Sequence, residues 1–161
     1  MYTNKTYVAF DADNDIRYYR LMQAWKKNDH TSFNFYDAHD LNNLMSWSSE
    51  ESIKAKLAER LRSTKVFVLL AGSNTKYLYK FVRWEIEQAI KRNIPIVVVN
   101  LSGKKFMDPD SCPAILQNEL AVHVSFSQKA IEFAIQNWGN SDIQYRREGK
   151  SGPYYYNESV Y

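Results

Sequence analysis

Two short runs of consecutive apolar residues constrain the fold of this chain more than any other feature. They span residues 66–70 and 94–99, and both are rich in valine, leucine or isoleucine. A strand that is apolar at every position has both of its faces covered, which is the usual state of a central strand in a parallel sheet. The two runs therefore predict an α/β fold in which helices lie on both faces of a parallel sheet.

Strand and helix signals alternate along the rest of the chain. Further strand signals lie at residues 6–10, 33–36 and 121–124, and helical periodicity covers residues 16–27, 49–62, 80–91 and 128–138. This alternation predicts a single domain with a five-stranded parallel sheet, most simply of the flavodoxin-like order 2-1-3-4-5. We expect residues 1–140 to form that domain and residues 141–161, which include three consecutive tyrosines, to form a C-terminal tail or small extension.

Composition argues against several classes of function. The 161 residues suit one domain, and the 21 basic and 18 acidic residues are interspersed, which argues against a nucleic-acid-binding surface. The amino terminus has no apolar signal region, and no run approaches the roughly 20 apolar residues that span a bilayer. Cys112 is the only cysteine, and the three histidines lack metal-ligand spacing. We therefore expect a cytoplasmic protein without a membrane segment, an intrachain disulfide or a metal site.

A polar turn and a glutamate follow the first apolar run, at a place where open α/β folds bind small molecules. Residues 71–75 form the turn, and Glu85 comes near the start of the next predicted helix. In a parallel sheet, the loop after a strand lies at the carboxyl edge, where binding sites form. The apolar spacing of the helix places Glu85 beside the buried stripe, so we expect it to be half sheltered. It is either a catalytic carboxylate or an acidic residue that complements the helix dipole and pairs with Arg83 or Arg92.

A second polar cluster, at residues 11–15, follows the first predicted strand. Aspartates two residues apart after a strand are typical of haloacid dehalogenase-like phosphatases, but that pattern has Thr or Val where this chain has Asp15. A calcium loop is excluded because Ile16 stands at its glycine position. A response-regulator receiver would have an aspartate where residues 71–72 are Ala-Gly. The cluster therefore either caps the following helix or lies at the mouth of a pocket.

Three segments of the sequence resemble one known family. They are Tyr-Val-Ala-Phe at residues 7–10, Val-Leu-Leu-Ala-Gly-Ser-Asn-Thr at 68–75 and Phe-Val-Arg-Trp-Glu-Ile at 81–86. Together they resemble the TIR-like domain of the bacterial Thoeris antiphage defence system, and the likeness extends over residues 5–138. The resemblance implies that Glu85 is the catalytic glutamate of an enzyme that cleaves the nicotinamide–ribose bond of NAD+. It also implies that the product is a cyclic ADP-ribose isomer, a diffusible signal that activates a partner effector protein.

The resemblance implies that NAD+ is the substrate and that no separate cofactor is needed. NAD+ would bind near the turn at residues 71–75, so the side chains around that turn are candidates for binding it. Aromatic rings can stack on nicotinamide or adenine, and hydroxyls or backbone amides can bind ribose and phosphate oxygens. The candidate substrate-binding residues are Phe10, Asp11, Trp47, Gly72, Ser73, Phe81 and Trp84. Trp47 comes from the loop at residues 37–48, where the family places nucleotide contacts. For the aromatic side chains, core packing is the competing interpretation.

Four functions remain open on the sequence. The first function is synthesis of the cyclic signal. The second is simple NAD+ hydrolysis, which would release linear ADP-ribose. A nucleoside deoxyribosyltransferase-like enzyme would use Glu85 as its nucleophile, and a non-catalytic TIR adaptor would only bind partners through its loops. For the signalling enzyme we expect activation by a phage protein trigger or by self-association into a homo-oligomer, because closure of the site would exclude water.

Overall fold

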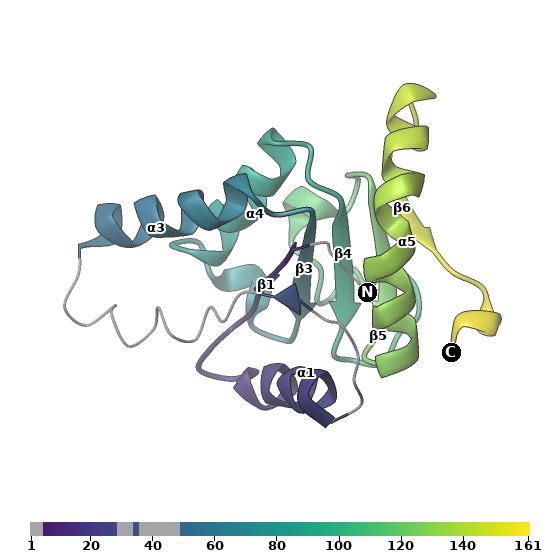
Figure 1. Cartoon of the computed structure of the whole chain (residues 1–161), viewed down its shortest axis with the longest axis horizontal. Coiled ribbons are helices and arrows are strands. Elements are labelled where there is room, and N and C mark those ends of the chain that lie inside the picture. The colour runs from purple at the N-terminus through teal and green to yellow at the C-terminus, as the bar shows by residue number, and fades with distance from the viewer. Residues whose placement is uncertain (1–4, 29–33, 36–48) are drawn as a thin grey trace.

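The computed structural model describes residues 5–28, 34–35 and 49–161, and its central layer is one parallel sheet (Figure 1). Among these residues, six strands pair in the order β2-β1-β3-β4-β5-β6, and every neighbouring pair is parallel. Their bounds are β1 Lys5–Ala9, β2 Asn34–Phe35, β3 Val66–Ala71, β4 Ile96–Asn100, β5 Ala121–Ser125 and β6 Pro153–Tyr155. The predicted order 2-1-3-4-5 is confirmed, and β6 extends the sheet beyond β5.

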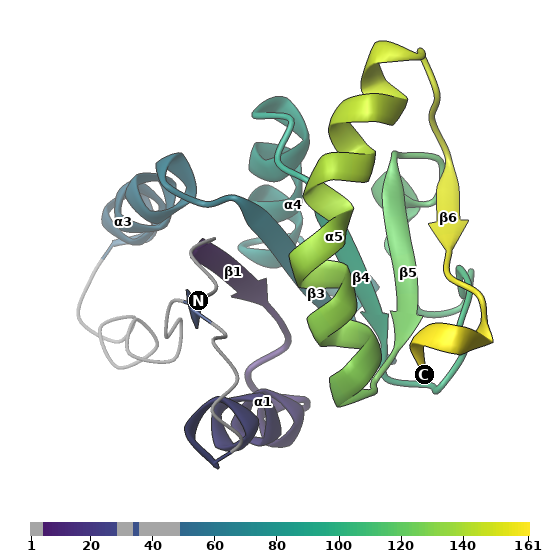
Figure 2. The same cartoon turned by 45° about the vertical axis from the view of Figure 1, so that its right-hand side comes forward.

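Helices cover both faces of the sheet, which confirms the predicted α/β class (Figure 2). One face carries α1 (Ile16–Asn28) and α5 (Gln128–Arg147), and the other carries α3 (Glu50–Arg62) and α4 (Val82–Lys91). The start of α3 is fixed by Ser49, whose hydroxyl accepts a hydrogen bond from the Ser52 amide at 3.2 Å. None of the helices in the described ranges is long and apolar enough to cross a membrane.

Alternate residues of the strands supply two separate cores. In β3, Val68 and Leu70 pack toward α1 and α5, whereas Phe67 and Leu69 pack toward α3 and α4. All six residues of β3 are buried, as the apolar run predicts. Each large apolar side chain buried in this way stabilises the fold by about 2 kcal/mol, so the sheet is a rigid base for the loops at its carboxyl edge.

The last helix is longer than its sequence pattern predicts. α5 continues past the predicted end at residue 138 to Arg147, so the boundary drawn at residue 140 falls inside a helix. The added turns hold a buried carboxylate, Asp142, which accepts a hydrogen bond from Arg146 Nε at 2.9 Å. Tyr145 stacks on Tyr154 with ring centroids 4.6 Å apart. These tertiary contacts therefore stabilise the helical conformation of residues 139–141, although Gly, Asn and Ser are weak helix formers.

Residues 151–161 lie along the edge of the sheet (Figure 2). After β6 the chain forms a short 3-10 helix, η3 (Glu158–Val160), and Tyr161 then accepts a hydrogen bond on its hydroxyl from the amide of Ser125 at 3.0 Å. An ion pair of 2.6 Å joins Lys105 to Glu158. The C-terminal segment thus covers the edge that β5 would otherwise expose to pairing with another chain.

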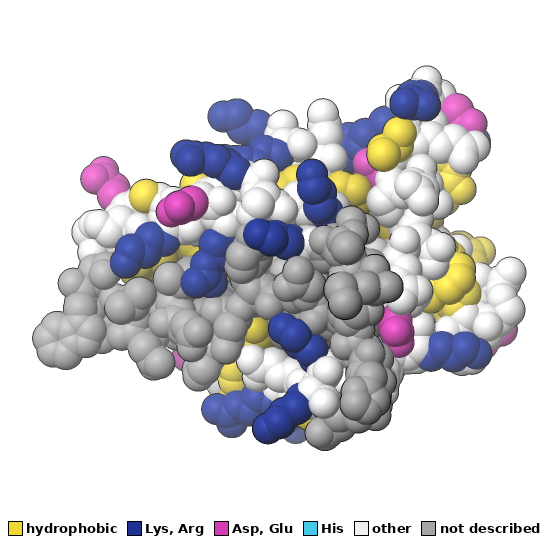
Figure 3. All heavy atoms as spheres, in the orientation of Figure 1, with side chains coloured by type: hydrophobic (Ala, Val, Ile, Leu, Met, Phe, Trp, Pro, Cys, Tyr) yellow, Lys and Arg dark blue, Asp and Glu magenta, His cyan; other side chains and the backbone are white. Residues whose placement is uncertain are grey.

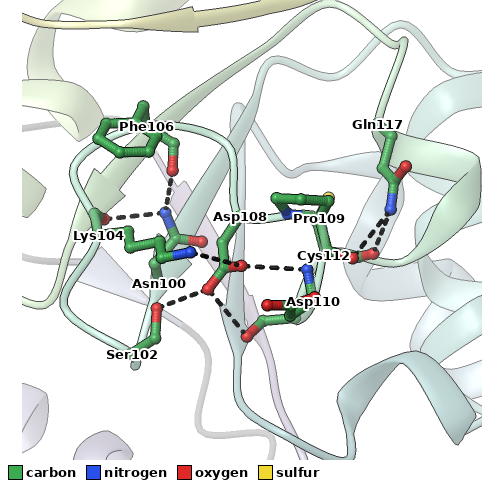
Figure 4. A network of polar contacts seen from close by, with 10 residues as sticks. Asn100, Ser102, Lys104, Phe106, Asp108, Pro109, Asp110, Cys112 and Gln117 are labelled. Carbon is green, nitrogen blue, oxygen red and sulfur yellow. Dashed lines mark hydrogen bonds and ion pairs between the residues drawn. The ribbon is translucent and has the colours of Figure 1, made fainter.

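The connection after β4 is irregular, as its prolines predict, and is organised around one buried carboxylate (Figure 4). Asp108 accepts hydrogen bonds from Ser102 Oγ at 2.7 Å and from the Asp110 amide at 3.0 Å, and it forms an ion pair with Lys104 at 3.6 Å. Burial acts to raise the pKa of Asp108, but these partners bring that pKa below its ordinary value. Asn100 ties the same loop to β4 by donating a hydrogen bond to the Lys104 carbonyl at 3.0 Å.

Surface charge is mixed on the face seen in Figure 3. Lys and Arg side chains are scattered over the described part of this face, with Asp and Glu side chains among them. Both signs are thus present on the described part of this face, as they are along the sequence.

Candidate active site

Glu85 lies in the first turn of α4 and points into the core between that helix and the sheet. Only 7% of the residue is exposed. The hydroxyl of Tyr7, on β1, donates a hydrogen bond to Glu85 Oε2, although the two residues are 78 positions apart in the sequence. Tyr7 is itself 1% exposed, and its ring stacks on Phe67 of β3 at a centroid distance of 5.5 Å. Two polar groups thus form a buried pair at the boundary between β1 and α4, within an otherwise apolar core.

The expectation that Glu85 is half sheltered beside the apolar stripe is wrong. The buried face of α4 consists of Val82, Glu85, Ile86 and Ala89, so Glu85 belongs to the stripe itself. The physical reason is the partner on the sheet, because Tyr7 supplies the donor that a buried carboxylate requires. The predicted ion pairs do not form either. Arg83 pairs instead with Glu87 at 2.9 Å, and Arg92 donates to Gln88.

Burial governs the ionisation of this pair. It raises the pKa of Glu85 from its ordinary value of 4.5 to about 7, and the hydrogen bond from Tyr7 acts in the opposite direction. The pKa of Tyr7 lies well above its ordinary value, first because of burial and then because of the nearby Glu85 charge. Burial thus favours the neutral form of Glu85, and the Tyr7 hydrogen bond favours the charged form. A carboxylate tuned in this way is typical of functional sites.

The carboxyl ends of β1 and β3 form a second polar centre. These adjacent strands send their following helices to opposite faces, since α1 packs on one side of the sheet and α4 on the other. Such a switch point opens a crevice where open α/β folds bind ligands. Here Asp15, from the loop before α1, meets Gly72, from the turn after β3. A Cβ added at Gly72 would lie only 2.3 Å from Asp15 Oδ2.

The turn after β3 is fixed by its own hydrogen bonds. Thr75 Oγ1 accepts a hydrogen bond from the Gly72 amide at 2.9 Å and donates one to the Leu70 carbonyl at 3.3 Å. The Gly72 amide, a candidate for binding substrate oxygens, is therefore already engaged within the turn. Ser73 is exposed and lies next to it at the carboxyl edge.

Gly72→Ala is expected to destabilise the protein by about 1–3 kcal/mol, because the new methyl group overlaps the Asp15 carboxylate. Urea unfolding measures the change. Asp15→Ala in the same background is the matched test, since it removes the overlapping atoms and should recover most of the loss. A Gly72→Ala variant as stable as the wild type would show that Asp15 does not occupy this position.

The acidic cluster divides into two roles. Asp11 caps the turn before α1, because its Oδ1 accepts a hydrogen bond from the Asp13 amide at 3.1 Å and its Oδ2 accepts one from Asn14 Nδ2 at 2.7 Å. Asp15 is buried against the turn, and burial, followed by the negative charge of Asp11, raises its pKa. Asp11 thus caps the turn, whereas Asp15 packs against Gly72.

The aromatic candidates do not gather at one place. Phe10 is 8% exposed and stacks on Tyr19 of α1 at 4.7 Å, in the core on the face of the sheet opposite to Glu85. Phe81 and Trp84 are half-buried at the start of α4, and Lys54 of α3 lies over the Trp84 ring at 5.6 Å. Phe10 therefore packs in the core, whereas Phe81 and Trp84 lie on the same face as Glu85.

Other features near α4 limit what the site can hold. A small pocket of about 80 Å³ is lined by residues of η1 (Thr75–Tyr77), α4 and η2 (Ala114–Leu116), and it includes Ile86 but not Glu85. In the described part of the chain, no group of three or more His, Cys, Asp or Glu side chains is placed to hold a metal ion. Trp47 and the predicted nucleotide loop at residues 37–48 lie outside the described residues.

Tyr7 is the residue that sequence reasoning missed, whereas for Asp15 it left open a place at the mouth of a pocket and did not name Gly72 as the contact. The signal for Tyr7 was present, because a tyrosine within a strand that is buried on both sides needs a hydrogen-bond partner. The partner of Tyr7 could not be predicted. Strand alternation predicts on which face of the sheet a side chain lies, but not which turn of which helix packs against it.

Comparison with known families shows to which family the chain belongs and which of these site residues the match covers. A family model for the TIR-like domain of the Thoeris protein ThsB matches residues 7–105, more than half of the chain. This chain belongs to that family. The matched part of the ThsB TIR-like domain contains Tyr7, Asp15, Gly72 and Glu85, whereas β5, α5 and β6 lie beyond it. A search of curated proteins gives no match to the chain.

Proposed function

We propose that this ThsB TIR-like domain cleaves the nicotinamide–ribose bond of NAD+ and converts the remaining nucleotide into a cyclic ADP-ribose isomer that activates a partner effector protein. The observation that carries the proposal is the carboxylate of Glu85, buried in the first turn of α4 with a pKa raised to about 7. Membership of the Thoeris family supports it. We place the reaction in the cytoplasm, where NAD+ is available.

The chemistry assigns Glu85 one task. Breaking the bond between the anomeric carbon and the nicotinamide nitrogen leaves positive charge on the ribose, and nicotinamide departs as a neutral molecule that needs no general acid. A carboxylate close to the ribose stabilises that charge, most strongly where water is excluded. A nucleophilic atom of the same nucleotide then bonds to the anomeric carbon and loses a proton. Cyclisation competes well with hydrolysis because the attacking group has a high effective concentration.

The polar groups at the switch point are the proposed contacts for the rest of NAD+. Ribose hydroxyls can donate hydrogen bonds to the Asp15 carboxylate, whose Oδ2 is buried without a hydrogen-bond partner in the structure. The exposed hydroxyl of Ser73 can reach a phosphate or ribose oxygen. Phe81 and Trp84 offer ring faces on the Glu85 side of the sheet. Asp11 serves this site through the turn that it caps.

The isolated protein is expected to cleave almost no NAD+ until a phage component or self-association activates it. The physical reason is access, because Glu85 is almost fully buried and its face must open before a substrate reaches it. Purified protein, and lysate from phage-challenged cells that express it, are incubated with NAD+, and the nucleotides are resolved by mass spectrometry. We expect the cyclic isomer and nicotinamide only in the triggered sample. Rapid turnover by the dilute, untriggered monomer to linear ADP-ribose alone would identify a simple hydrolase.

A parallel incubation with a deoxynucleoside and a free base, beside the one with NAD+, separates the remaining functions. A nucleoside deoxyribosyltransferase-like enzyme would exchange bases on deoxynucleosides and leave NAD+ intact. A non-catalytic adaptor would turn over neither substrate at any protein concentration. Either result would overturn the proposed activity.

A further inference from the structure

We propose that Tyr7 is a positioning residue for this reaction: its hydroxyl holds the Glu85 carboxylate in one orientation and favours the charged form of that carboxylate. This role rests on the proposed NAD+ cleavage, but the coupling between the two side chains can be tested without it. In the described structure, the Tyr7 hydroxyl binds the Glu85 side chain directly, and both residues are buried.

The geometry of Tyr7 leaves it little freedom. Its backbone is paired in the sheet, where it lies opposite Phe67 of β3, and its ring stacks on the same residue at 5.5 Å. At 1% exposure the hydroxyl does not exchange its partner for bulk water. The helix side is equally fixed, since the Glu85 amide donates to the Phe81 carbonyl at 2.8 Å in the first turn of α4. The hydrogen bond therefore joins two rigid elements and engages Oε2 of the carboxylate.

Packing alone does not require a polar pair at this position. Replacing a buried polar pair with apolar side chains of similar volume is often neutral or stabilising, so a fold that needed only packing here could use leucine and phenylalanine. A donor that binds a carboxylate favours its charged form, which is the form that the reaction uses. Without the phenol, burial alone would push Glu85 further toward the neutral acid.

The surrounding charges do not replace Tyr7. Arg60 of α3 acts on the same pair, because its positive charge acts to lower the pKa of Tyr7. On α3, Lys54 lies over the Trp84 ring, and on the exposed side of α4, Arg83 pairs with Glu87. All residues of β3, the strand beneath the pair, are apolar. Tyr7 is thus the group placed to set the charge of Glu85 by direct contact.

Tyr7→Phe is expected to lower the rate at pH 7 by about tenfold or more, because a hydrogen bond to a charged group is removed while the ring packing stays. The loss of a donor raises the pKa of Glu85 further, so the acid limb of the pH–rate profile should move to higher pH. Activity should recover in part at pH 9, where Glu85 is ionised in the variant as well. Tyr19→Phe is the matched control, because it also removes a buried tyrosine hydroxyl, but on the opposite face of the sheet.

A second measurement needs no turnover. Protein carrying ¹³C-labelled glutamate is titrated by NMR, and the Glu85 carboxyl signal is assigned by its absence in Glu85→Gln. We expect that signal to titrate near pH 7 in the wild type and in Tyr19→Phe, and at clearly higher pH in Tyr7→Phe. An unchanged or lower titration midpoint in folded Tyr7→Phe would overturn the proposal. If the coupling is present but triggered wild type never cleaves NAD+, the proposed function fails, and the catalytic role of Tyr7 fails with it.

Discussion

Glu85→Gln is expected to reduce NAD+ cleavage by on the order of a hundredfold or more while the fold stays intact. Glutamine keeps the size of the side chain and still accepts the hydrogen bond from Tyr7, but it carries no negative charge to oppose the cationic ribose. Unlike Tyr7→Phe, this variant should not regain activity at alkaline pH. Glu87→Gln is the matched control, since it changes the same group two residues further along α4 on the exposed side.

The same substitution has a pH-dependent effect on stability. The pKa of Glu85 is raised in the folded state, so the folded protein binds this proton more tightly than the unfolded chain does. The corresponding stability is present in full below pH 4.5 and is lost as the pH rises through about 7. Because glutamine stays neutral, Glu85→Gln should be more stable than the wild type at pH 8 by up to about 3 kcal/mol and about equal to it at pH 4. Urea unfolding at the two pH values measures this. A variant that is less stable at pH 8 would contradict the burial of a charged Glu85.

Deletion of residues 151–161 is expected to cost about 3–5 kcal/mol, a large part of the stability of a domain of this size. The segment buries Val160 in the core under α5, and Tyr154 stacks on Tyr145 and packs against Trp138 at 5.8 Å. Its removal also uncovers the edge of β5, which then presents unpaired backbone groups. Thermal and urea unfolding measure the loss, and light scattering detects association through the new edge.

The control for the deletion is a change within the same segment that removes little buried surface. Tyr155 is 68% exposed, so Tyr155→Ser should alter the free energy of unfolding by no more than about 0.5 kcal/mol. If the shortened chain were as stable and as monomeric as the wild type, the C-terminal segment would be a dispensable extension rather than part of the sheet.

The sheet could be predicted because its signals are local. β3 and β4 are apolar on both sides, which only a central parallel strand explains, and the helices between them show their own periodicity. β6 has only three residues, none of them buried, so it depends on pairing with β5 rather than on a pattern of its own. The end of α5 was misplaced for a similar reason, since contacts with the C-terminal segment override weak helix propensity.

The site was less accessible to sequence reasoning because its contacts are long-range. The motif around Glu85 located the residue, but the position of its side chain depends on a hydroxyl 78 residues earlier. Phe10 illustrates the opposite error. It directly follows β1, at the edge of the sheet that also holds the turn after β3, yet its ring lies on the face that carries α1, where it stacks on Tyr19. Proximity along the edge of a sheet does not give the face on which a side chain lies.

Nicotinamide release is the most direct test of the central claim, which is that Glu85 of this protein cleaves NAD+. NAD+ labelled in the nicotinamide ring is added to lysates of phage-challenged cells that express the wild type, Glu85→Gln or Glu87→Gln at equal levels. The account predicts free labelled nicotinamide, with a matching amount of cyclic ADP-ribose isomer, from the wild type and Glu87→Gln and none above background from Glu85→Gln. Equal release from the wild type and a folded Glu85→Gln, or release from none of the three, would contradict it.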